Sequence, residues 1–270
     1  MKKLFLLLSF VLIFIIGLTG CYHKEDSLEL MNKYYDNIKS NNFDENYNYL
    51  SSASKNIWTK ENYKEWENIE QEVFPYKDVQ IEKINEYKDK ELDGTKYQNV
   101  VEYNITDFYH DNYHDKDGNS NFVIYAVIEN NQWKIYRENE KPKDKIAQVK
   151  YDLAGMYFTG KGENKDTNKA QDILNKSIEE NPDYSNSYYL LGFFYTYLQR
   201  NDEAITIIEQ NMDKAKSNEE KSNLYDVLGL AYEGKQDYNN AKAYYTKSIE
   251  ADSNNEPAKT NLAKLNSKLQ

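Results

Sequence analysis

Apolar residues after position 25 first recur with a helical period and then alternate. From Leu28 to Ile38 an apolar residue occurs every three or four positions, and two further helical segments follow between Phe43 and Val73. After Pro75 the period changes towards two, in four runs separated by turn residues. The turns are expected at Asp93-Gly94, Asp117-Gly118-Asn119 and Asn130-Asn131. Three helices followed by a four-stranded antiparallel sheet predict an α+β fold over residues 26–137.

A different pattern begins near residue 146, where helical periodicity returns and one motif occurs twice. Tyrosine, leucine, glycine and tyrosine recur at one spacing, and an alanine follows each leucine thirteen positions later. The copies are Tyr188, Leu191, Gly192, Tyr195 and Ala204, and Tyr225, Leu228, Gly229, Tyr232 and Ala241. This spacing resembles the tetratricopeptide repeat. The resemblance implies an all-α solenoid of three helical hairpins over residues 147–184, 185–221 and 222–255, followed by a capping helix within 256–270.

The same resemblance implies a concave groove, lined by the first helix of each hairpin, that binds another protein. The expected groove residues are Tyr151, Phe158, Tyr189, Phe193, Asp226, Leu230 and Glu233, with Gln148, Asn186, Thr196 and Asn223 beside them. Tyr189 and Phe193 have two interpretations: they pack against neighbouring helices or the first domain, or they anchor a bound segment. Basic residues are scarce at these positions, so we expect an unidentified protein or peptide partner with an apolar or basic segment.

The four strands end in a turn followed by Trp133-Lys134-Ile135-Tyr136. Helices followed by such a sheet are similar to the cone-shaped domains of the nuclear transport factor 2-like superfamily. The resemblance implies a curved sheet that wraps around the helices and leaves a pocket. It supports an alternative function, a small-molecule-binding or weakly catalytic domain presented by the repeats. An enclosed cavity lined by apolar and ionisable groups would favour this alternative, whereas a cone filled by side chains would favour a scaffold.

The chain shows no arrangement of residues that points to an enzyme or a cofactor. It contains no glycine-rich phosphate loop and no set of residues for nucleophilic catalysis. Asp115 to Asn119 matches the start of a calcium-binding loop, but Ser120 replaces the required glycine and Ala126 the required glutamate. His110 and His114 would stand about 13 Å apart on a strand, too far to share a metal ion. We therefore expect neither a metal site nor a cofactor.

The amino terminus carries the pattern of an export signal. Lys2 and Lys3 precede an apolar run that includes Leu4 to Phe14, interrupted by Ser9, and Leu18-Thr19-Gly20-Cys21 follows. The run is too short to span a bilayer stably, since about 13 helical residues reach about 20 Å against a hydrocarbon core of about 30 Å. Leu18-Thr19-Gly20-Cys21 resembles the lipobox of bacterial lipoproteins. The resemblance implies a signal peptide over residues 1–20, acyl chains on Cys21, a tether over residues 21–25 and attachment to the extracytoplasmic face of a bacterial cell membrane.

Charge and composition narrow the range of partners. The chain has 34 basic and 45 acidic residues, and its net charge of -11 becomes −13 (32 − 45) once Lys2 and Lys3 are removed. Such a surface repels phosphate groups, and no basic patch is present, which excludes a nucleic-acid partner. The charged stretch 138–146 contains Pro142 and is expected to be a linker. The sequence thus predicts a lipid-anchored, non-enzymatic adaptor or scaffold that acts through its repeats.

Overall fold

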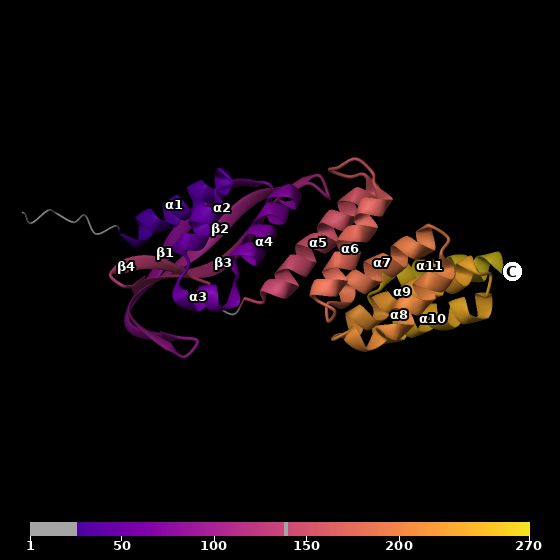
Figure 1. The fold of residues 1–270 in the computed structure, drawn as a ribbon. Helices are drawn as coiled ribbons and strands as arrows, with labels where there is room; N and C mark the ends of the chain where they lie inside the picture. The colour runs from indigo at the N-terminus through magenta and orange to yellow at the C-terminus, as the bar shows by residue number, and fades with distance from the viewer. Residues whose placement is uncertain (1–25, 138–139) are drawn as a thin grey trace, which may run out of the picture.

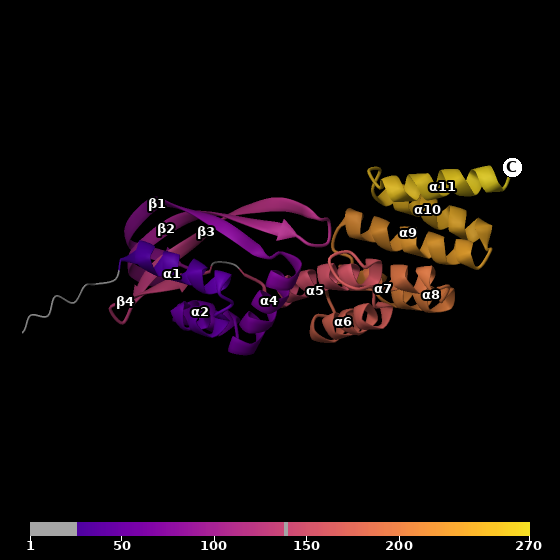
Figure 2. The ribbon, with the colours of Figure 1, turned by 90° about the horizontal axis from the view of Figure 1, so that it is seen from above.

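The computed structural model describes residues 26–137 and 140–270 (Figure 1). The predicted signal peptide (1–20), the lipid site Cys21 and the tether (21–25) lie outside the described residues. The described part of the N-terminal domain contains four helices and one sheet, and Figure 2 shows α1, α2 and α4 on the same face of that sheet. The elements are α1 (Ser27–Lys39), α2 (Phe43–Tyr49), α3 (Ser52–Ile57), α4 (Lys60–Val73), β1 (Tyr76–Leu92), β2 (Thr95–Asp111), β3 (Lys116–Glu129) and β4 (Gln132–Tyr136).

The sheet is antiparallel with the strand order β1-β2-β3-β4, which confirms the predicted four-stranded meander. Alternate side chains of β2 and β3 point towards the helices and form a common core with them. This core includes Leu30, Tyr34, Trp58, Tyr63, Trp66, Tyr103, Ile105 and Ile124. The aromatic content of the core explains how a domain with few helical turns buries enough apolar surface to be stable.

Helix α3 was missing from the sequence prediction, which expected three helices before the sheet. It is six residues long, which is too short to show a helical period. It begins where the Ser51 hydroxyl accepts a hydrogen bond from the Ser54 amide at 3.1 Å. A single capping interaction therefore starts this helix, and such a signal is easily overlooked in a serine-rich stretch.

The turn expected at Asp117-Gly118-Asn119 was wrong. These residues lie within β3, and the chain reverses direction at residues 112–115. Gly118 pairs across the sheet with Tyr109, and a Cβ on Gly118 would lie 2.7 Å from the Tyr109 ring. Glycine at this position therefore allows an aromatic ring to cover the neighbouring strand, and it does not form a turn.

Residues 142–268 form helices that pair as antiparallel hairpins and stack along the chain (Figure 1). They are α5 (Pro142–Thr159), α6 (Thr167–Glu180), α7 (Ser185–Tyr197), α8 (Asn201–Gln210), α9 (Asn218–Gly234), α10 (Tyr238–Ala251) and α11 (Glu256–Lys268), with a short 3-10 helix at Met212–Lys214. Ala170, Ala204 and Ala241 are fully buried, so the recurring alanine of the motif serves helix packing. Among the described helices, none combines the length and the apolar character needed to cross a bilayer.

The two halves of the chain meet in a packed junction, which corrects the linker expected over residues 138–146. Helix α5 begins at Pro142, and Ile146 is buried in the core of the N-terminal domain. Lys150 is 3% exposed and lies 2.9 Å from the Glu65 carboxylate of α4. Lys143, Asp144 and Lys145 suggested a linker, but they lie in the first turn of α5, where proline and exposed charges are well tolerated.

Gly229→Ala is expected to destabilise the repeats by about 1–3 kcal/mol, because the added methyl group overpacks the third hairpin. A Cβ on Gly229 would lie 2.4 Å from the ring of Tyr245, which is fully buried and donates a hydrogen bond from its hydroxyl to Glu233. Urea unfolding followed by circular dichroism measures the change. Gly234→Ala is the control, because its Cβ meets the flexible end of Asn201. An equal loss of stability at both positions would contradict the packing argument.

Candidate functional site

Two of the predicted groove residues are buried in the repeats. Phe158 is 5% exposed, and its ring stacks on Phe194 with the ring centroids 3.7 Å apart. Asp226 is 6% exposed and accepts a hydrogen bond from the Asn261 side-chain amide at 3.1 Å. Neither side chain is open to a partner along the groove, in contrast to the prediction. Both positions serve contacts between successive helices.

The other groove residues are partly buried. Tyr189 and Phe193 of α7 lie between two apolar clusters, one built with α5 and α6 and the other with α8 and α9. Leu230 packs against the cluster that contains Tyr245, and the Glu233 carboxylate accepts the hydrogen bond from the Tyr245 hydroxyl at 3.0 Å. Tyr189 and Phe193 therefore pack against neighbouring helices, as the first of their two interpretations expects, while both residues stay partly exposed.

The turn between β2 and β3 covers the groove at its first repeat. Tyr113 in this turn lies against Gly155 of α5, where a Cβ would be 2.9 Å from the Tyr113 ring. Tyr113 and Tyr151 pack against the same cluster. The Asn112 side chain donates a hydrogen bond to the Glu72 carbonyl oxygen of α4 at 2.8 Å, which holds the turn in place. The groove along α5 is therefore filled by the protein itself.

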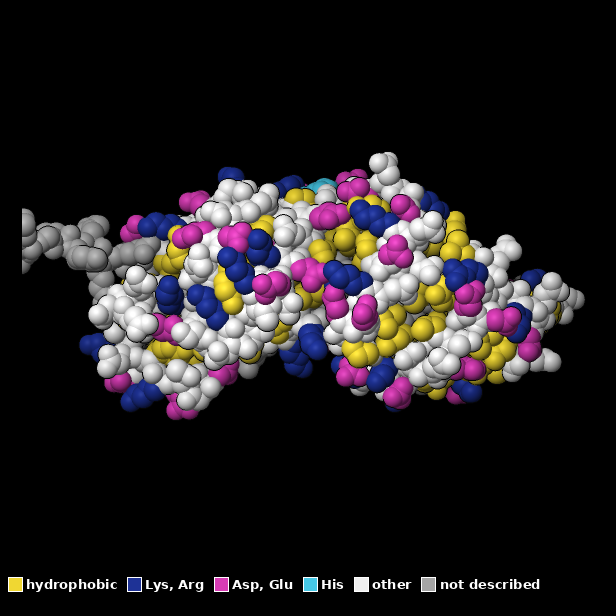
Figure 3. All heavy atoms as spheres, viewed as in Figure 1, with side chains coloured by type: hydrophobic (Ala, Val, Ile, Leu, Met, Phe, Trp, Pro, Cys, Tyr) yellow, Lys and Arg dark blue, Asp and Glu magenta, His cyan; other side chains and the backbone are white. Residues whose placement is uncertain are grey.

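A hollow of about 640 Å³ lies between α7 and α9. We term it the repeat hollow, and it is lined by Phe193, Thr196, Tyr197, Gln199, Asn201, Leu230 and Gly234. Tyr197 is 57% exposed, and its hydroxyl lies 3.4 Å from the Lys165 ammonium group at the edge of the hollow. Figure 3 shows hydrophobic side chains at the surface of the repeat region. The repeat hollow therefore keeps part of the predicted groove accessible, at Phe193, Thr196 and Leu230.

Acidic groups lie beside this groove. Burial raises the pKa of Asp226 to about 6, although its hydrogen bond with Asn261 acts in the opposite direction. Burial likewise raises the pKa of Asp152 to about 6, and Asp152 accepts a hydrogen bond from Gln148 at 3.0 Å. None of the predicted groove positions carries lysine or arginine. An apolar or basic segment therefore fits this face better than an acidic one.

A second cavity, of about 630 Å³, lies in the N-terminal domain between the sheet, α4 and the start of α5. We term it the junction pocket. Its aromatic residues are Tyr35, Trp66, Phe74, Tyr76, Tyr109 and Phe122, and its charged residues include Glu67, Glu70, Asp107, Arg137, Glu140 and Lys145. This combination of apolar and ionisable groups is the lining that the small-molecule alternative requires.

One buried arginine organises the charges of the junction pocket. Arg137 donates from Nε to Glu140 at 2.8 Å and from Nη1 to the Tyr34 hydroxyl at 2.7 Å. Glu67 is 2% exposed, and its Oε1 has no hydrogen-bond partner among the residues that the structure describes. Burial raises the pKa of Glu67, and burial followed by the charge of Glu67 raises that of Glu70 to about 7. The pocket thus holds two carboxyl groups whose ionised form is disfavoured by burial.

Sequence reasoning did not single out these pocket residues. The available signal was the spacing of Glu67 and Glu70, which lie one helical turn apart on α4 next to the apolar Trp66. Arg137 is one of two arginines in the chain, and this is the feature that distinguishes it in the sequence. A local sequence pattern does not reveal contacts between α4 and a residue about seventy positions away.

The two histidines do not form a joint site. His110 Nδ1 lies 2.8 Å from Asp117, whereas His114 Nδ1 lies 2.7 Å from Asp111. His110 Nε2 also lies 3.4 Å from Asp115, so the two rings interact with different aspartates. Within residues 26–137 and 140–270, no three histidine, cysteine, aspartate or glutamate side chains are grouped so that they could hold a metal ion.

Two family models described as tetratricopeptide repeat match the chain, over residues 173–206 and 222–255. The second match has the bounds expected for the third hairpin, so the predicted presence of tetratricopeptide repeats is confirmed. No curated protein matches the chain.

Three solved structures are similar to this protein over 46% of its length. The first tetratricopeptide repeat domain of human RPAP3 is 22% identical, with 91% of that chain covered and a TM-score of 0.40. The first such domain of Spaghetti (RPAP3), bound to an HSP90 peptide, is 21% identical, with 92% covered and a TM-score of 0.39. The Arabidopsis OM64 domain is 20% identical, with 98% covered and a TM-score of 0.39.

Proposed function

We propose that this protein is a lipid-anchored, non-enzymatic scaffold that binds another protein through the repeat hollow, on the extracytoplasmic face of a bacterial membrane. Tetratricopeptide repeats are present, and such repeats indicate protein–protein interaction. The observation that carries the proposal is the repeat hollow itself. The turn between β2 and β3 fills the groove along α5, so a partner would bind further along, between α7 and α9.

The residues of the repeat hollow indicate the chemistry of the partner. Tyr197 presents a largely exposed aromatic ring, with Phe193 and Leu230 in the same hollow. Aromatic anchors of this kind contribute roughly 2 kcal/mol or more each to binding. The partly exposed Glu233 is on the same helix as Leu230. The partner is therefore expected to offer an apolar or basic segment.

Thr196→Lys is expected to weaken partner binding at least about tenfold, because it places a long charged side chain in the repeat hollow and repels a basic segment. Thr206→Lys is the matched control. Each threonine hydroxyl donates to a carbonyl oxygen of its own helix, that of Phe193 at 2.7 Å and that of Asp202 at 2.8 Å, but Thr206 is exposed on α8 away from the lining. Photo-crosslinking in cells from position 197 measures binding in both variants.

Either of two results would refute partner binding at the repeat hollow. One is an equal yield of crosslinked product from the Thr196→Lys and Thr206→Lys variants. The other is that a crosslinking residue at position 197 gives only products that a crosslinking residue in place of Ile84 also gives. Ile84 is a suitable reference because it is a large apolar residue, 45% exposed, on β1 of the other domain.

Cys21→Ala is expected to abolish the incorporation of radioactive palmitate and to release the protein from the membrane fraction. Cys21 is the only cysteine of the chain and follows the lipobox-like Leu18-Thr19-Gly20. Acyl chains contribute about 0.8 kcal/mol per buried methylene, and two chains are needed for stable retention. Palmitate labelling followed by fractionation provides the measurement. Equal labelling of the wild type and the variant would refute the lipid anchor.

Small-molecule binding by the N-terminal domain is the second candidate function. The junction pocket favours it, because its walls combine aromatic rings with ionisable groups. The predicted likeness to the nuclear transport factor 2-like superfamily, whose curved sheets leave a pocket, belongs to this candidate. In this arrangement the repeats would present a ligand-binding domain to the protein partner.

A further inference from the structure

We propose that the junction pocket binds a small organic cation, a primary or quaternary amine, which Glu67 and Glu70 hold beside the aromatic rings of the pocket wall. This inference rests on the second candidate function and specifies its ligand class. The pocket volume of about 630 Å³ lies within the range of about 300–1,000 Å³ that is typical of small-molecule sites.

One oxygen of the Glu67 side chain lacks a hydrogen-bonding partner among the described residues. It lines the pocket and is 2% exposed, and Oε1 accepts no hydrogen bond within the described part of the chain. A buried carboxylate oxygen without a hydrogen-bond donor is unfavourable, because it has lost its hydrogen bonds to water and has formed none within the protein. An ammonium group in the pocket would supply the missing charge-assisted hydrogen bond.

Glu70 places a second carboxylate at the same cavity. It lies one helical turn after Glu67 on α4, so both side chains are on one side of the helix, and both line the pocket. Two ionised carboxylates one helical turn apart repel each other. The charge of Glu67, after burial, accordingly raises the pKa of Glu70. A single cation bound beside them would relieve this repulsion.

Two of the three basic residues of the pocket, Arg137 and Lys145, are already paired with Glu140, so an anion is the less favourable ligand. Arg137 donates to Glu140 and to Tyr34, and Lys145 Nζ lies 3.4 Å from Glu140. The described lining contains five acidic and three basic side chains, which gives a net charge of −2 (3 − 5) when all are ionised. The uncompensated charge is therefore negative.

Aromatic rings form much of the remaining wall, and such rings attract cations through their faces. Tyr35 and Tyr76 are stacked with ring centroids 6.2 Å apart. Trp66 already attracts cations within the protein, since Arg137 Cζ and Lys145 Nζ lie 4.9 and 5.0 Å from its ring centroid. Carboxylates next to aromatic faces suit an organic ammonium ion better than a metal ion, which needs several oxygen ligands around it.

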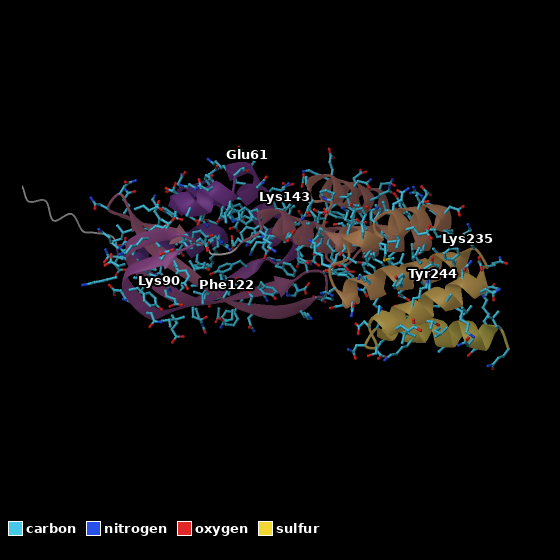
Figure 4. The ribbon with its side chains drawn as sticks, turned by 90° about the horizontal axis from the view of Figure 1, so that it is seen from below. Glu61, Lys90, Phe122, Lys143, Lys235 and Tyr244 are labelled. Atoms are coloured by element: carbon cyan, nitrogen blue, oxygen red, sulfur yellow. The ribbon has the colours of Figure 1, made fainter. Side chains whose placement is uncertain are left out.

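Isothermal titration of the purified full-length protein with benzylamine, benzyl alcohol and benzoate tests the proposal, because these probes share one ring and differ in charge. Benzylamine is expected to bind at least about tenfold more tightly than benzyl alcohol, and benzoate not to bind. Glu67→Gln and Glu70→Gln should each weaken benzylamine binding at least about tenfold. Glu61→Gln, at the exposed outer edge of α4, should leave it unchanged (Figure 4).

Glutamine has nearly the size of glutamate, and a thermal unfolding curve verifies that each variant is folded. The proposal is overturned if benzyl alcohol or benzoate binds as tightly as benzylamine, or if neither benzylamine nor choline binds at millimolar concentration. It is equally overturned if Glu61→Gln weakens binding as much as Glu67→Gln. None of these results bears on the repeat hollow, which the Thr196 variant tests in a different part of the chain.

Discussion

Replacing Arg137 by methionine is expected to lower the free energy of unfolding by about 3–5 kcal/mol. Arg137 is 7% exposed and joins three parts of the N-terminal domain. It donates to Glu140 and to the Tyr34 hydroxyl of α1, and its guanidinium group lies over the Trp66 ring of α4. Methionine replaces part of the volume but leaves Glu140 without its closest cation. The desolvation cost of the buried carboxylate then remains without the attraction that offset it.

Arg200→Met is the matched control, since Arg137 and Arg200 are the only arginines in the chain. The Arg200 side chain is 38% exposed and pairs with Glu203, which is 52% exposed. Such a surface pair contributes at most about 1 kcal/mol, because water and salt screen it. Urea unfolding of both variants provides the comparison. Similar losses of unfolding free energy in the two variants would contradict the argument that burial makes the Arg137 contacts contribute more to stability than a surface pair.

Glu70→Gln is expected to stabilise the protein by about 3 kcal/mol near pH 8 and to change little near pH 4. Burial, and next the charge of Glu67, raises the pKa of Glu70 from its ordinary value of 4.5 to about 7. Between these two values the folded protein keeps a proton that the unfolded chain has released. The stability of the wild type therefore falls as the pH rises through this window, and glutamine removes that loss.

The charged groups around Glu70 determine how steeply the stability of the Glu70→Gln variant still falls with rising pH. Glu67 and Asp107 raise its pKa, whereas Lys145 and Arg137 lower it. Because the pKa of Glu67 is shifted in the same direction, Glu70→Gln should reduce the slope without abolishing it. Thermal unfolding from about pH 4 to about pH 8, in a buffer without amines, measures the effect. With Glu61→Gln as the control, parallel curves for wild type and Glu70→Gln would contradict the assignment.

Elements with a long regular pattern could be predicted from the sequence, and those that depend on one contact could not. The helical period of α1 and the alternation in the four strands extend over enough residues to be recognised. Helix α3 depends on one capping serine, and the true turn at residues 112–115 carries no glycine. Gly118 misled the prediction because it is needed beside the Tyr109 ring, a contact between two strands.

The candidate sites were predictable to different extents. The repeat spacing placed Phe193, Thr196 and Leu230 on one face, and the structure brings these three together in the repeat hollow. The same spacing also proposed Phe158 and Asp226, which are buried by contacts with Phe194 and Asn261. A repeat register identifies which face of a helix a residue occupies, but exposure also depends on what packs against that face.

The sequence alone determined the four strands, the paired helices of the repeats and the helix face on which each predicted groove position lies, because local spacing decides which side of each helix or strand is apolar. Only the tertiary structure decided that Tyr113 covers the groove beside Gly155 and that Arg137, Glu67 and Glu70 line one pocket. These groups come from segments far apart in the chain. Their meeting depends on how α5 packs against α4 and the sheet, and a local period carries no information about that packing.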